Sequence, residues 1–112
     1  MPARSVAFVA QFLEHEEEAV AEAAALALGD SRLESAWPVL RDAAQRPHNR
    51  PLRRTLLLAL ALLRREPAVD YLLELVGTGE PGVAADAEAA LAMYEQDPKV
   101  QEGLERARRS RA

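Results

Sequence analysis

The sequence predicts an all-α protein in which short helical hairpins stack into a superhelix. Of its 112 residues 49% are apolar but only 4% aromatic, and a core of alanine and leucine suits closely packed helices better than a β-sheet. Apolar residues recur three and four positions apart in several segments, which is the spacing of one helix face. Because these segments repeat along the chain, we expect a right-handed solenoid of about three helical hairpins plus an N-terminal helix.

Three segments have the pattern expected of the first helix in each hairpin. Pro51 and Pro81 stand where two of these helices would begin, since proline suits a first helical turn. The earliest segment begins with glutamates, which the positive end of a helix dipole favours, and Gly29 predicts where that helix ends. The segments are residues 16–28, 50–65 and 81–94.

Each first helix is followed by a short turn and a second helical stretch. The second stretches are residues 35–45, 66–76 and 97–109. Leu40, Leu73 and Leu104 then fall into register, at separations of 33 and 31 residues. One unit is therefore helix, turn, helix and loop, and it must stack on its neighbours to bury its apolar face. The expected core consists of Val20, Ala24, Leu28, Ala36, Leu40, Leu57, Leu60, Val69, Leu73, Ala87, Leu91, Val100 and Leu104.

The length fits a single repeat domain over residues 1–112. Its units would be a partial repeat or N-terminal helix at 1–15, followed by repeats at 16–47, 48–79 and 80–112. The first of these resembles the second helix of a unit whose first helix is absent. An alternative stays open, because no glycine or proline separates Leu13 from Glu16: one helix could run from about residue 5 to residue 28.

The first unit carries the residues of a known repeat in the stretch AAALALGDSRLESAWPVLRDA, residues 23–43. It resembles the short HEAT-like repeat of phycobilisome lyases and many bacterial scaffold proteins, in which an alanine-rich helix ends in Ala-Leu-Gly and Ala-Val-Pro-x-Leu follows. The matching residues are Ala27, Leu28, Gly29, Ala36, Trp37, Pro38 and Leu40. The later units match less well, since leucine or alanine replaces the glycine. The resemblance implies an architecture and no particular activity.

No set of residues resembles a catalytic or metal centre. The chain has two histidines and no cysteine, and no nucleophile stands beside a base. His15 and the three glutamates after it would point in different directions on a helix and would not converge on one ion. The string GTGEPG at residues 77–82 matches a dinucleotide-binding motif but follows a helical pattern rather than a strand. We therefore expect no enzyme activity, cofactor or metal.

The distribution of apolar residues also bears on location. No apolar run reaches the ~18 residues of a membrane span. The short apolar stretch near the N-terminus lacks a cleavage site of the signal-peptide type. We expect a cytoplasmic protein without membrane contact, which the lack of cysteine fits.

Charge is unevenly distributed in a chain with a net charge of −4. Residues 41–66 hold seven arginines against Asp42 and Glu66, whereas the segments on either side are acidic. The second helical stretches, which are expected to line the concave side, carry Asp70, Glu74, Glu102 and Glu105 against Arg41, and this excess of carboxylates opposes the phosphates of a nucleic acid. The charge pattern therefore disfavours a nucleic-acid partner.

The second helices are expected to line the concave side of the solenoid and to carry the partner-binding ridge. Trp37 and Tyr71 would form an aromatic floor with a mainly acidic rim, a surface suited to a protein of basic or mixed charge. The full ridge would be Trp37, Arg41, Asp70, Tyr71, Glu74, Gln101 and Glu105. This favours a non-catalytic protein-interaction scaffold. The resemblance implies one alternative, a bilin-lyase-like enzyme or accessory protein that holds a tetrapyrrole, and a nucleic-acid-binding HEAT-like module is a second.

The N-terminal segment has more apolar residues than it could bury against one neighbouring helix. The ends of a solenoid need a polar outer face for solubility, but Phe8 and Phe12 stand among valines and leucine in this segment. We expect these two aromatic residues to mediate self-association or to contact a further domain upstream.

Overall fold

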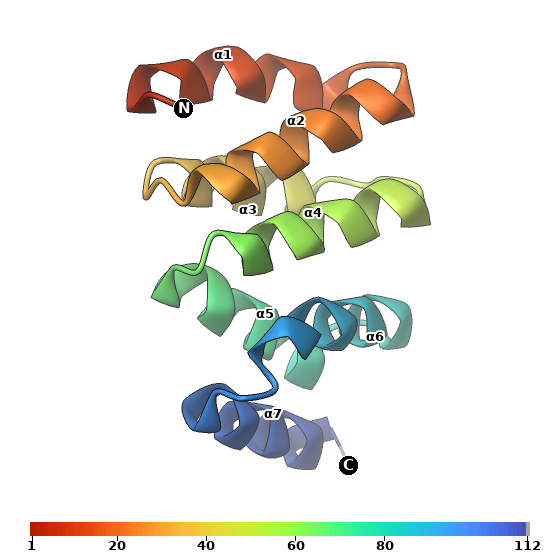
Figure 1. Cartoon of the computed structure of the whole chain (residues 1–112). Coiled ribbons are helices and arrows are strands. Elements are labelled where there is room, and N and C mark those ends of the chain that lie inside the picture. The colour runs from red at the N-terminus through yellow and green to blue at the C-terminus, as the bar shows by residue number, and fades with distance from the viewer. Residues whose placement is uncertain (112) are drawn as a thin grey trace.

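In the computed structural model, which describes residues 1–111, the chain is an all-α solenoid without strands in that range (Figure 1). The helices are α1 (Val6–Ala10), α2 (Glu18–Ser31), α3 (Ala36–Gln45), α4 (Arg50–Leu62), α5 (Glu66–Thr78), α6 (Pro81–Ala90) and α7 (Pro98–Arg111). Short 3₁₀ segments flank α1 at Ala3–Ser5 and Gln11–Glu14, and another continues α6 at Leu91–Tyr94.

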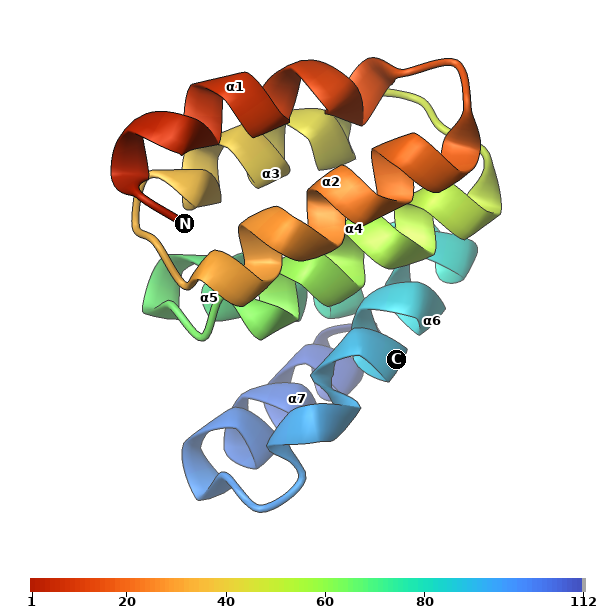
Figure 2. The same cartoon turned by 45° about the horizontal axis from the view of Figure 1, so that its top comes forward.

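The helices stack roughly in chain order, from α1 at one end of the molecule to α7 at the other (Figure 1). The first helices of the hairpins form one row, in which α2 packs along α4 and α4 packs on α6. The second helices form another row, in which α5 packs closely on α7 but touches α3 at few positions. From the second viewpoint, α6 and α7 are turned relative to the α2–α4 pair (Figure 2).

The N-terminal segment and α2 are two helices, so the alternative of one long helix is wrong. The chain becomes extended at His15, whose φ and ψ are −64° and 141°. The backbone N–H of Glu17 donates a 3.0 Å hydrogen bond to Nδ1 of His15. A histidine side chain thus stabilises the break that a glycine or proline would have signalled.

Gly29 does not end α2, which is a correction to the expectation from sequence. The helix continues to Ser31, and Arg32 takes the left-handed conformation after it, with φ 55°. Gly29 is instead a point of close contact, because a Cβ atom there would lie 2.6 Å from the carbonyl oxygen of Ala59 in α4. Arg64 repeats the left-handed conformation after α4, so it follows that helix rather than lying in its last turn.

The sequence favours three helix caps, at Ser35, Glu66 and Asp97, because serine and acidic side chains accept hydrogen bonds from the first turn of a helix. Asp97 caps α7, since its Oδ1 accepts a 3.0 Å hydrogen bond from the backbone N–H of Lys99. Ser35 precedes α3 as expected but makes no side-chain capping bond. The prediction of a Glu66 cap is wrong, because Arg65 precedes α5 and Glu66 is already its first residue.

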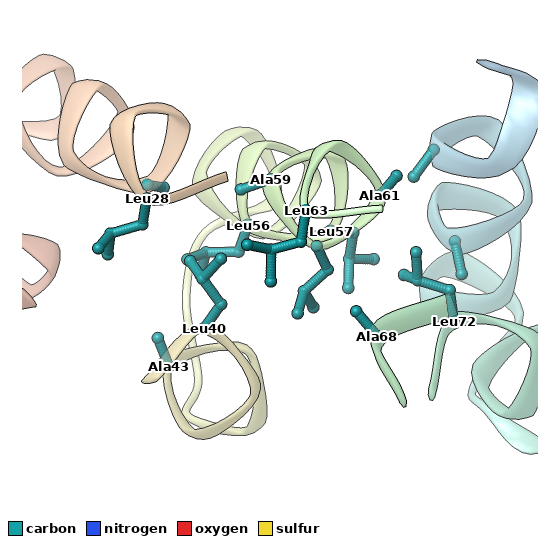
Figure 3. Packing of buried hydrophobic residues seen from close by; sticks show 14 of the residues in the cluster. Leu28, Leu40, Ala43, Leu56, Leu57, Ala59, Ala61, Leu63, Ala68 and Leu72 are labelled. Carbon is teal, nitrogen blue, oxygen red and sulfur yellow. The ribbon is translucent and has the colours of Figure 1, made fainter. Parts of the chain in front are cut away.

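Leucine and alanine side chains fill the space between the two rows of helices. Leu28, Leu40, Leu57 and Leu72 converge there from four different helices (Figure 3). Ten of the predicted core residues are buried. Val20, Val69 and Leu73 are only half-buried, and Ala21, Ala68 and Leu72 are buried beside them. The inward register of the second helices therefore repeats every 32 residues, through Leu40, Leu72 and Leu104, and the alignment on Leu73 was one position too far.

Candidate protein-binding groove

A groove of about 340 Å³ lies between α3 and α5. Its walls come from one face of each helix. The lining residues are Trp37, Arg41, Gln45, Pro67, Asp70, Tyr71 and Glu74. Five of the seven residues predicted from sequence to form the partner-binding ridge are therefore brought together here.

The groove exists because two aromatic rings stand between the helices. The rings of Trp37 and Tyr71 meet edge to face, with centroids 5.7 Å apart and planes at 62°. Both side chains are half-buried and pack against the core at their inner edge. On the other side of the same two hairpins, Gly29 lets α2 approach the backbone of α4. Small residues on one side and aromatic residues on the other keep α3 apart from α5.

The charged groups of the groove are not neutralised within it. Arg41 places its guanidinium over the ring of Trp37, 5.3 Å from the centroid. The same guanidinium forms a 3.1 Å ion pair with Asp42, which lies outside the groove. Asp70 and Glu74 form no ion pair with any residue between 1 and 111. The rim therefore presents two uncompensated carboxylates to solvent.

The pKa of Tyr71 reflects the partly buried, acidic surroundings of the groove. Burial raises the pKa of Tyr71 above its ordinary value, and the negative charge of Glu74 raises it further. Contacts with Gln45 and Arg41 lower that pKa, but they do not cancel the increase. Tyr71 is thus a neutral aromatic group at neutral pH, with its ring available for contact.

The two remaining predicted ridge residues lie elsewhere. Gln101 and Glu105 belong to α7 and do not line the α3–α5 groove. Nε2 of Gln101 donates a 3.0 Å hydrogen bond to the backbone oxygen of Tyr94, so this side chain is engaged internally. Glu105 is exposed. Sequence reasoning missed Gln45 and Pro67, although each lies about one helical turn from a predicted residue on the same helix.

Trp37 is accessible from a second hollow as well. A shallow depression of about 650 Å³, also lined by Trp37, lies beside the start of α3 and Ala3 of the N-terminal segment. Its apolar walls include Leu33, Pro38 and Ala3, and Arg65 and Glu34 lie at its edge. Trp37 therefore forms the ridge between two depressions, where a partner residue could contact it from either side.

Several arginines of the basic block serve the fold. Asp86 in α6 is buried and accepts a 2.8 Å hydrogen bond from Nη2 of Arg53 and a 3.2 Å bond from Nη2 of Arg50. Burial acts to raise the pKa of Asp86, but the hydrogen bonds from Arg53 and Arg50 outweigh it and hold that pKa below its ordinary value. These two arginines join α4 to α6 through the buried carboxylate, although the Arg50 side chain is itself 65% exposed.

The N-terminal aromatic residues differ in exposure. Phe8 is 61% exposed, whereas Phe12 is partly buried against the core. Their rings meet edge to face at 5.4 Å. An apolar edge of the stack is thus open at α1.

The motifs tested for chemistry occupy ordinary structural positions. The string GTGEPG joins the end of α5 to the start of α6, so a helix precedes it rather than the strand that a dinucleotide site needs. Within residues 1–111 no group of three histidine or acidic side chains is placed to hold a metal ion. Over the same residues, every helix is too short or too polar to cross a bilayer.

Comparison with known proteins identifies the repeat. The family model described as HEAT repeats matches residues 2–61, which include α1 to α3 and nearly all of α4. The chain belongs to the HEAT-repeat family. No curated protein matches the chain. The family match supports the HEAT-like part of the resemblance noted in the sequence, and the narrower phycobilisome-lyase type stays a prediction.

Proposed function

We propose that this HEAT-repeat protein is a non-catalytic scaffold that binds a protein partner of basic or mixed charge in the α3–α5 groove. HEAT repeats are commonly protein-interaction scaffolds. The observation that carries the proposal is the combination of two half-buried aromatic rings with two unpaired, exposed carboxylates in one groove. Aromatic side chains at the centre of an interface supply much of its binding energy, and a polar rim excludes water from them.

The test is capture and identification of the partner, followed by binding measurements with purified proteins. Trp37→Ala removes the ridge between the two depressions, and Glu74→Arg reverses the charge of the rim. We expect either change to weaken the identified partner's binding at least tenfold, since central aromatic residues contribute about 2 kcal/mol or more.

A matched control keeps the result specific to the groove. Glu95 is exposed and lies outside the groove, in the turn before α7. Glu95→Arg makes the same charge change as Glu74→Arg and should leave binding unchanged. A partner that binds both groove variants as tightly as the wild-type chain would show that its site is elsewhere.

Two other functions are separated by direct titration. The bilin-lyase alternative predicts a saturable change in the absorbance of an added bilin. The nucleic-acid alternative predicts binding of a DNA duplex that weakens steeply with salt. Because Arg50 and Arg53 already pair with Asp86, they are less available to phosphates, and we expect no DNA binding. We expect no bilin response either.

The open edge at α1 carries a separate proposal of self-association through Phe8 and Phe12. Phe8→Ser should shift sedimentation of a concentrated sample toward the monomer, because it removes an exposed apolar ring. Leu58→Ser is the control, since Leu58 is also exposed but lies on α4. Identical monomeric sedimentation of the wild-type chain and both variants would contradict this role.

A further inference from the structure

The α3–α5 groove has the parts of a binding site for one kind of side chain. Asp70 and Glu74 lie one helical turn apart on α5 and line the same wall. Neither has a cation within ion-pair distance among residues 1–111, although Arg41 lines the opposite wall. Arg41 is held by Asp42 instead. The charge of the α5 wall is therefore left for a cation from outside.

Arg41 also shows what the aromatic face accommodates. Its guanidinium lies 5.3 Å from the centroid of the Trp37 ring, within the ~6 Å range of a cation–π interaction. Because the Tyr71 ring meets Trp37 at 62°, the two rings form a corner rather than a flat surface. A planar guanidinium stacks on such rings while its N–H groups reach carboxylates, whereas an ammonium is more strongly hydrated and cannot stack.

We propose that the groove binds an arginine side chain from a basic segment of the partner protein. The proposal rests on the function proposed above and specifies what the groove recognises. The incoming guanidinium lies against the Trp37–Tyr71 corner and donates hydrogen bonds to Asp70 and Glu74. Arg41 competes for the same aromatic face and repels the incoming cation, so it limits the affinity of the site.

The chain contains its own reporter for this test, because Trp37 is its only tryptophan. The probe is the blocked peptide Gly-Arg-Gly-Arg-Gly, titrated into the whole chain while tryptophan fluorescence is followed and calorimetry is run in parallel. We expect saturable binding that weakens as salt is raised. The lysine version of the peptide should bind several-fold more weakly, and the glutamine version should not bind.

Three variants distinguish recognition of a cation from nonspecific binding of the peptide to the groove. Asp70→Asn combined with Glu74→Gln should weaken arginine-peptide binding about tenfold. Arg41→Met keeps an apolar chain against Trp37 but removes the competing charge, and it should tighten binding about threefold. Glu95→Gln removes a carboxylate outside the groove and should change nothing. Circular dichroism confirms that each variant is folded.

The outcomes also separate this proposal from the wider one. Equal binding of the glutamine and arginine peptides, no binding of any peptide, or weaker binding by Arg41→Met would each overturn arginine recognition. The scaffold function would survive those results if an identified partner still lost affinity for Trp37→Ala. If the arginine peptide binds as predicted but the partner binds Trp37→Ala as tightly as the wild-type chain, arginine recognition is supported. The groove is then not the partner's docking site.

Discussion

The first two hairpins meet along two seams that differ in how closely their helices approach. On the α2–α4 side, Gly29 brings two backbones together, and a Cβ atom there would lie 2.6 Å from the oxygen of Ala59. On the α3–α5 side, Trp37 and Tyr71 stand between the helices and leave a groove. Because the same hairpins form both seams, close contact on one side keeps the other open. We call the closely packed α2–α4 contact the sealed seam and the α3–α5 contact with its groove the open seam. We infer that the sealed seam stabilises the fold and that the open seam binds the partner protein.

The largest effect is expected from Gly29→Ala in the sealed seam. The added methyl group would overlap backbone atoms of Ala59, which cannot rotate away as a side chain can. Alanine favours a helix more than glycine does, but overpacking against backbone costs more. We expect a loss of about 2–3 kcal/mol in the free energy of unfolding, measured by urea denaturation.

Gly77→Ala is the matched control for that prediction. Gly77 is also helical, in α5, but a Cβ atom there would lie 3.5 Å or more from the nearest atoms of Ala107. This is ordinary van der Waals contact, so the gain in helix propensity should leave the variant up to about 1 kcal/mol more stable. Equal losses for the two variants would refute the idea that close approach at Gly29 is special.

The next largest loss of stability is expected between α4 and α6, which are joined by ion pairs rather than by a close approach of backbones at a glycine. Asp86→Asn keeps the shape of the side chain but removes the charge that Arg50 and Arg53 contact, and it should cost about 2 kcal/mol. Glu88→Gln on the same helix should cost less than about 0.5 kcal/mol, because Glu88 pairs with Arg108 at the surface. Denaturation of both variants distinguishes a buried ion pair from an exposed one.

The same carboxylate predicts a pH dependence. The folded-state pKa of Asp86 is held below its unfolded value, so ionised Asp86 stabilises the fold fully above about pH 4. That contribution is lost as pH falls through the folded-state pKa. The difference in stability between the wild-type chain and Asp86→Asn should therefore be constant from pH 7 to pH 5 and shrink below pH 4. A difference that stays constant down to pH 3 would show that the charge of Asp86 contributes nothing.

The sequence predicted the hairpin order and most of the groove, because both depend on local spacing. Ala36 and Leu40 recur at helical intervals, so their neighbour Trp37 could be placed at the edge of the core. The middle unit was shifted by one residue, since Leu72 and Leu73 are both leucine and nothing local tells which one faces inward. Only packing against the neighbouring helices decides that Leu72 is buried.

Other features depend on contacts between repeats, which no local pattern reveals. Gly29 has the position of a helix stop, and only the approach of α4 shows that its lack of a side chain is used for packing. Arg50 and Arg53 lie in a predicted helix, and nothing in the local sequence pairs them with Asp86 in the next repeat. A signal for Asp86 was present, however, because it stands among the alanines of a predicted apolar helix, where a buried carboxylate needs a cation.

The smallest expected effect on stability belongs to the open seam, and it tests the comparison most directly. Asp70→Asn combined with Glu74→Gln removes two exposed carboxylates that have no ion pair within residues 1–111, so the free energy of unfolding should change by less than about 0.5 kcal/mol. The same variant should lose most of its affinity for the arginine peptide, whereas Glu88→Gln, with a similarly small change in stability, should keep it because Glu88 lies outside the groove. If the double variant were instead as destabilised as Asp86→Asn, the two carboxylates would be structural, and the division between a sealed seam for stability and an open seam for recognition would fail. Urea denaturation and peptide titration on the same preparation decide between these results.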